Sequence, residues 1–301
     1  MTITPIRLLH QNATREAFLA FRGYIFGLWF LAILIDPMAR LASLPAGYYL
    51  PVGVLRLLPE PAHAMLLSGG GLNALKGLLL VTCALSIWPR AFRWAGPPAV
   101  LLLLVYQSLI RGFTHINHAQ ILLLLAAITL VLFEHLPRRA APAARNPYAA
   151  PLLTIAAVIT LSYALLGSWR IYDDISTLTG DTILNYVASR SLRTSYYDFN
   201  VGLQVIGWAP AALMLRIGFP VITLVEMTAL LVLVSRRYRA LFLAVMVPFH
   251  LLTFVLMEVS FIENLLLYVV LVDFSPLVER FRPFLPFRRG RGPALAPPVP
   301  G

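Results

Sequence analysis

Arg111-Gly-Phe-Thr-His-Ile-Asn-His-Ala-Gln120 leads without a break into the apolar run Ile121–Phe133. Polar side chains therefore stand at the entrance of a segment whose composition suits lipid: Arg111, His115, Asn117, His118 and Gln120. A polar group at membrane depth costs free energy unless it is paired, so such a group is a candidate for function. A loop at the membrane surface is the alternative, because there the same side chains would meet water and lipid head groups.

Composition indicates a multi-pass membrane protein. Hydrophobic residues make up 59% of the 301 residues and charged residues 12%, and the mean hydropathy is +0.79. These values are typical of membrane-spanning chains and not of soluble domains. A net charge of +11 would suggest nucleic-acid binding in a soluble protein. Here the arginines gather in short loops, as membrane topology requires, so we expect no nucleic-acid partner.

The apolar runs predict an all-α bundle of about eight transmembrane helices. We expect the spans at residues 17–35, 72–88, 95–110, 118–135, 151–169, 217–235, 240–257 and 261–274. Gly23 and Gly27 form a small-residue pair that would let another helix approach the first span closely.

The expected spans form a single transmembrane domain over residues 1–276. A proline-broken linker lies near 136–150, and a polar segment at 170–208 includes a helix expected to lie on the membrane. Residues 37–61 carry several prolines and predict a surface or partly re-entrant loop. Residues 277–301 form a basic, proline-rich tail that we expect to be disordered.

The arginines also predict an orientation. With eight spans and the N-terminus inside, most loop arginines fall on the inner side, so both termini are expected in the cytoplasm. The expected location is the inner membrane of a bacterium. The only cysteine in the sequence is Cys83, so there is no intrachain disulfide and no thiolate metal site.

In this topology several spans bring ionisable side chains to the outer half of the membrane: His115, His118, Arg170 and His250, with Glu226 near mid-depth. Each residue alone has a structural explanation, such as a histidine bonded to a carbonyl or a glutamate that ties two helices together. Their convergence favours a shared, outward-facing polar pocket. The three histidines carry no carboxylate pattern beside them, so we expect no metal site.

The order and spacing of these residues resemble the vitamin K-dependent gamma-carboxylase-like family, whose bacterial members are called HTTM proteins. The similarity covers residues 18–276, and the features that carry it are Asn117-His118 before an apolar helix, Tyr163-Ala-Leu-Leu-Gly-Ser-Trp-Arg170, Glu226 in an apolar span, and Phe249-His250 with Phe261-Ile-Glu-Asn-Leu-Leu-Leu267. The chain is similar, more loosely, to DoxX-like quinone-associated bundles.

This resemblance implies a chemistry. Carboxylases of the family convert protein glutamate to gamma-carboxyglutamate with reduced vitamin K, and a membrane histidine and a basic lysine carry the reaction. The resemblance, together with the polar pocket, gives His118, Arg170 and His250 as candidate catalytic residues. The candidate cofactor contacts are His115, Asn117, Tyr163 and Glu226. The sequence does not identify the cofactor, and a quinone-type lipid is the candidate.

Arg170 departs from the family pattern, because it stands where the lysine is expected. A buried lysine can lose its proton and act as a base, whereas a guanidinium stays protonated in proteins. No large extramembrane domain follows Phe274 in this sequence either. We therefore do not expect carboxylation of glutamate.

Three classes of function remain open. The first is a membrane enzyme or redox protein that binds a quinone-type lipid, with His118 as acid or base and Arg170 as a clamp on a carbonyl or anion. The second is an accessory protein that helps to mature or export a secreted partner. The third is a structural subunit of a larger membrane complex. Membrane lipids are expected partners in all three.

Overall fold

The computed structural model describes residues 9–113, 120–135, 146–173, 181–192 and 201–281, and within these ranges the secondary structure is helical. Six helices are long and apolar enough to cross a membrane: α1 (Arg15–Ile35), α3 (Gly69–Ile87), α4 (Phe92–Phe113), α6 (Ala149–Asp173), α9 (Ala209–Met227) and α10 (Arg236–Met257). This confirms the predicted all-α membrane bundle.

The two remaining expected spans correspond to shorter apolar helices. One is α5 (Ile121–His135), and the other is α11 (Ile262–Leu267) continued by the 3₁₀ helix η7 (Tyr268–Leu271). The count of eight spans stays a prediction for these two segments. The described residues also form η1 (Met38–Ser43), η2 (Ala46–Tyr48), η3 (Gly53–Leu57), α2 (Glu60–Leu67), α7 (Asp181–Ser191), α8 (Gly202–Gly207), η6 (Ala229–Leu233) and α12 (Ser275–Phe281).

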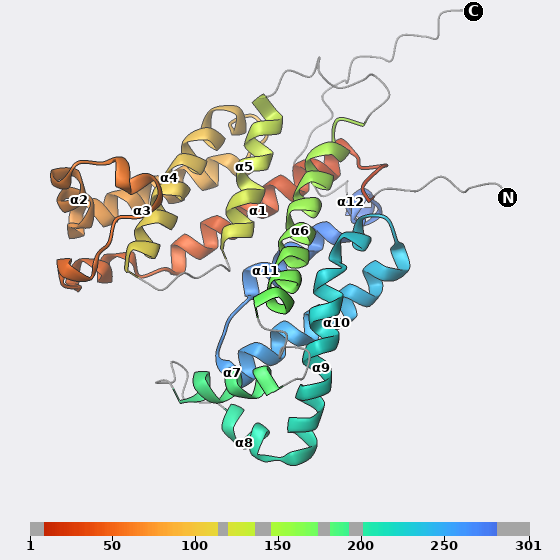
Figure 1. Ribbon diagram of the computed structural model, residues 1–301. Coiled ribbons are helices and arrows are strands. Elements are labelled where there is room, and N and C mark those ends of the chain that lie inside the picture. The colour runs from red at the N-terminus through yellow and green to blue at the C-terminus, as the bar shows by residue number, and fades with distance from the viewer. Residues whose placement is uncertain (1–8, 114–119, 136–145, 174–180, 193–200, 282–301) are drawn as a thin grey trace, which may run out of the picture.

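Helix α6 joins two groups of helices. Helices α1 to α5 lie together on one side in Figure 1, and α7 to α10 lie on the other. Helix α6 packs against α5 of the first group and against α9 and η6 of the second, while α11 contacts both α5 and α10. Side chains on α6 and α11 are therefore placed to meet side chains from both groups.

Two sets of hydrogen bonds mark the two ends of the bundle. At one end, which we call the Asp36 end, Lys76 Nζ donates to the carbonyl of Asp36 (2.6 Å), and Gln120 donates to Glu263 (3.4 Å). At the opposite end, which we call the His10 end, the amide of Leu9 donates to the carbonyl of Leu233 (3.1 Å). Consecutive long helices thus run alternately between the two ends, as a multi-pass topology requires.

Short polar side chains set several helix starts. Thr14 caps α1 by accepting from the amide of Ala17 (3.1 Å), and Ser68 caps α3 by accepting from the amide of Gly71 (3.0 Å). Each cap satisfies an amide that has no partner within its own helix, so each fixes where an apolar segment begins.

The sixth span begins earlier than the sequence indicates. The expected span starts at residue 217, and the sequence allows a further, weaker helix over residues 200–215. In the structure α9 begins at Ala209 and runs across this boundary. Arg216 is accommodated because its Nε pairs with Asp181 of α7 at 2.9 Å on an exposed surface. The predicted span 217–235 therefore corresponds to the second half of α9 followed by η6.

The expected helix in the polar segment is present as α7, which buries Ile183 and Val187. Its placement on a membrane surface stays a prediction. Helix α12 extends to Phe281, beyond the expected end of the domain at residue 276. Residues 136–145 of the expected linker and 282–301 of the expected tail lie outside the described residues.

Candidate functional site

An ion pair joins α6 to α9. Arg170 Nη1 contacts Glu226 Oε2, and the side chain of Glu226 is only 1% exposed. The guanidinium also lies 5.4 Å from the centre of the Phe219 ring. A buried carboxylate is tolerated when a cation and hydrogen bonds compensate its lost hydration, and Arg170 supplies both.

Gly167 makes this pairing possible. It lies one turn before Arg170, on the face of α6 that meets α9. A Cβ atom at Gly167 would stand 2.6 Å from the amide nitrogen of Met227 and 2.8 Å from the carbonyl oxygen of Thr223. Only glycine lets the two backbones approach so closely, and this brings Glu226 within reach of Arg170.

About two turns before Arg170 on α6, Tyr163 forms a triangle of hydrogen-bonding groups with two other side chains. Tyr268 donates its hydroxyl to Tyr163 at 2.7 Å, and both hydroxyl oxygens lie 2.9 Å from His250 Nε2. When Tyr163 donates to Nε2, the ring proton of a neutral imidazole is on Nδ1. The three side chains come from α6, α10 and η7, so the triangle ties three helical segments together.

Three polar atoms around this triangle have no hydrogen-bond partner within the described part of the chain: Glu226 Oε1, His250 Nδ1 and Asn264 Oδ1. All three residues are buried, with exposed fractions of 1%, 3% and 8%. Asn264 interacts with Tyr163, and the charges of Arg170 and Glu226 both act on Tyr163. Leaving a buried polar group unpaired costs about 1–3 kcal/mol, so these atoms are suited to a further partner.

The structure brings together four of the seven site residues expected from the sequence: Tyr163, Arg170, Glu226 and His250. The expected residues His115, Asn117 and His118 lie outside the described residues. Tyr268 and Asn264 were not expected. A signal for them exists, since each is a hydrogen-bonding side chain in the short apolar segment 261–274.

Gln120, from the polar entrance to α5, takes part in a different contact. Gln107 of α4 donates to Gln120 (2.5 Å), and Gln120 donates to Glu263 of α11 (3.4 Å). Close by, Tyr106 donates to the carboxylate of Asp36. These side chains pair with one another at the Asp36 end.

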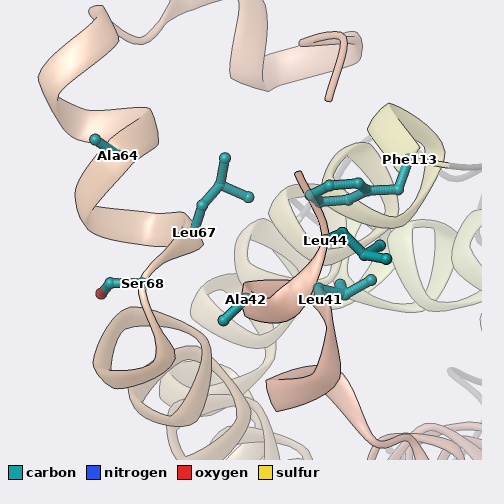
Figure 2. A pocket seen from close by; sticks show the side chains of 7 residues that line it. All are labelled: Leu41, Ala42, Leu44, Ala64, Leu67, Ser68 and Phe113. Carbon is teal, nitrogen blue, oxygen red and sulfur yellow. The ribbon is translucent and has the colours of Figure 1, made fainter. Parts of the chain in front are cut away.

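One cavity lies away from this cluster. It has a volume of about 230 Å³ and is lined by Leu41, Ala42, Leu44, Ala64, Leu67, Ser68 and Phe113 (Figure 2). None of the expected site residues lines it. Within the described residues, no group of three or more His, Cys, Asp or Glu side chains is arranged to hold a metal ion.

Comparison with known proteins identified no relative of this chain. No family model, no curated protein and no solved structure matches this chain.

Proposed function

We propose that this multi-pass membrane protein binds the head group of a quinone-type or related lipid-like ligand at the cluster formed by Tyr163, Arg170, Glu226, His250 and Tyr268. The observation that carries the proposal is the set of buried polar atoms without partners around the tyrosine–histidine triangle. His250 Nδ1 can donate a hydrogen bond, whereas Glu226 Oε1 and Asn264 Oδ1 can accept one. A head group that carries carbonyl or hydroxyl oxygens matches this mixture.

The ion pair supports the expectation that the protein does not carboxylate glutamate. Arg170 is paired with Glu226. A permanently protonated guanidinium cannot remove the proton that the reaction requires. Incubation with a glutamate peptide, reduced vitamin K and labelled carbon dioxide is expected to give no incorporation of label. Sustained incorporation would overturn this part of the proposal.

The proposal includes the membrane and the orientation expected from the sequence. The six long apolar helices support an integral membrane location. The bacterial inner membrane, the cytoplasmic termini and the resemblance to HTTM proteins are parts of the proposal that rest on the sequence.

Ligand binding can be measured with purified protein in lipid nanodiscs and a short-chain ubiquinone or menaquinone, with tryptophan fluorescence as the readout. Tyr163→Phe removes the hydroxyl that donates to His250 Nε2 and so keeps the ring proton on Nδ1. It is expected to weaken binding by about tenfold, because the ligand then loses the hydrogen bond from Nδ1, worth about 1.4 kcal/mol. Tyr172→Phe is the matched control, because Tyr172 lies on the same helix but is 82% exposed. Equal affinities for wild type and Tyr163→Phe, or no saturable binding, would contradict the proposal.

A structural role is the second candidate, and one observation favours it. The ion pair and the triangle satisfy most of their polar atoms within the chain, and they link α6 to α9, α10 and η7. Such pairing holds helices together in lipid without any ligand. Absence of saturable quinone binding, together with a large loss of stability in Tyr163→Phe, would favour this role.

A further inference from the structure

The segment between α1 and α3 borders an open cavity, lined mainly by apolar side chains, at the Asp36 end of the bundle. Figure 2 shows Leu67 and Phe113 on opposite sides of this space, with Leu41 and Leu44 below Phe113. Ser68 is the one polar residue in the lining, and its hydroxyl is already engaged. It donates to the carbonyl of Met65 (2.7 Å) and accepts from the amide of Gly71 (3.0 Å). The side chains of the lining therefore offer an occupant mainly dispersion contacts.

The wall of the cavity is held in place by contacts with α4. The amide of Leu50 donates to the carbonyl of Gly112 (2.9 Å), and the amide of Val54 donates to Ser108 Oγ (3.3 Å). A Cβ atom at Gly112 would stand 2.5 Å from the ring of Tyr49. The segment thus packs directly on the backbone of α4, which holds this wall of the cavity in place.

The size and lining of the cavity favour a hydrocarbon group. The cavity has a volume of about 230 Å³ and is open to its surroundings. Its lining side chains are apolar apart from Ser68, so they favour contact with a hydrocarbon chain over contact with water.

The surroundings of the cavity indicate that membrane lipid supplies the hydrocarbon group. The cavity lies where three membrane-spanning helices end, because η1 follows α1, Ser68 caps α3, and Phe113 ends α4. The same segment exposes large apolar side chains, including Leu57 (84%) and Met65 (73%), which indicates contact with lipid. Arg40 and Arg56 are also exposed on it, and such cations complement the phosphate of a lipid head group.

We propose that this cavity receives an acyl chain of a membrane phospholipid and so forms a lipid-binding site separate from the polar cluster. The segment 37–68 is then neither a free loop nor a span. It is a docked lid that holds one lipid against α4, with apolar side chains toward the chain and arginines toward the head group.

Photo-crosslinking tests the site directly. Full-length protein is placed in phosphatidylglycerol nanodiscs that contain a trace of phosphatidylglycerol with a diazirine in one acyl chain, and the labelled residues are identified by mass spectrometry. We expect enriched labelling at residues 41–44 and 64–68. Ala64→Phe and Ala42→Phe fill the cavity from two walls, and each is expected to lower this labelling by about tenfold, the effect of roughly 1.4 kcal/mol of lost affinity.

Met65→Phe is the matched control, since it adds the same ring at a neighbouring, exposed position that does not line the cavity. It is expected to keep the labelling of wild type. Size-exclusion chromatography shows which variants fold, and one folded cavity-filling variant is sufficient. Unchanged labelling in a folded variant, labelling spread evenly over α9 and α10, or a crosslink to a second copy of the chain at these residues would each overturn the proposal.

Discussion

At the scale of single residues, two ion pairs of this protein differ in how much stability is lost when they are broken. The pair of Arg170 and Glu226 is largely buried, with side-chain exposures of 24% and 1%. The pair of Arg216 and Asp181 is exposed, at 50% and 64%. The attraction in both pairs is the same in kind. The consequence of breaking them differs, because only the loss of Arg170 leaves a carboxylate that is buried away from water.

This contrast gives a prediction for Arg170→Met. The substitution leaves Glu226 buried and unpaired, so we expect a loss of about 3 kcal/mol in the free energy of unfolding. The double variant Arg170→Met with Glu226→Gln removes the stranded charge and should recover most of that loss. Arg216→Met is the control and should cost less than about 1 kcal/mol. Stability is measured by thermal unfolding in detergent, and a similar loss for Arg170→Met and Arg216→Met would contradict the prediction.

At the scale of helices, the sequence predicts the apolar elements well and their contacts poorly. Hydropathy alone places all six long helices, because lipid exposure demands continuous apolar runs. It also singles out Arg170, Glu226 and His250, since an ionisable group in such a run is conspicuous, whereas Tyr163 is expected from the family resemblance. It misses Tyr268, whose hydroxyl does not stand out in an apolar segment. It also does not join residues 209–216 to the sixth span, although Arg216 within α9 pairs with Asp181, which is remote in sequence.

The glycines also show that the sequence does not predict which helices come into contact. Gly23 and Gly27 predict a close helix approach, but a Cβ at Gly23 would make only ordinary contact with Ile87 (3.7 Å), and one at Gly27 would meet nothing within 4 Å. The close approach occurs at Gly167 instead. A small residue permits a close contact, but which helix arrives there depends on the packing of the whole bundle.

A second prediction follows for these two glycines. Gly167→Ala forces α6 away from α9, and the overpacking should lower stability by about 1–3 kcal/mol. Gly27→Ala meets open space and should be neutral or stabilise by up to about 1 kcal/mol, because alanine favours the helix. Thermal unfolding of the two variants compares them directly. A stable Gly167→Ala protein with unchanged ligand affinity would show that the α6–α9 contact can relax.

At the scale of the whole molecule, the alternating helices make a prediction about topology. The turn between α3 and α4 and the exposed face of α7 should lie on opposite sides of the membrane. Arg90→Cys and Asn185→Cys test this with an impermeant thiol reagent, applied to intact and to opened cells. Cys83 is fully buried and should stay unlabelled. We expect Arg90→Cys to react from the cytoplasmic side only and Asn185→Cys from the outside only. Labelling of both from one side would contradict the eight-span arrangement.

The N-terminal segment connects the beginning of the chain to its last helices at the His10 end. His10 is buried, its Nε2 lies 2.6 Å from the carbonyl oxygen of Val270, and its ring packs edge-on against Phe274 (5.6 Å). Burial lowers the pKa of His10 below its ordinary value of 6.5. The hydrogen bond to Val270 and the charge of Asp273 oppose this shift, and the charge of Arg239 adds to it. Burial is the largest effect, so the docked segment favours neutral imidazole.

The sign of the pH effect follows from this. A histidine whose pKa is lowered in the docked state gives its full stabilisation above pH 6.5, and loses it as the pH falls and the undocked segment takes up a proton. Hydrogen-exchange protection factors for residues 9–13 should therefore be lower at pH 5.5 than at pH 7.5. His10→Asn tolerates the positive φ of 61° at this position and does not titrate, so its protection should stay constant over this range. Equal pH profiles for wild type and His10→Asn would show that another group controls docking of the N-terminal segment.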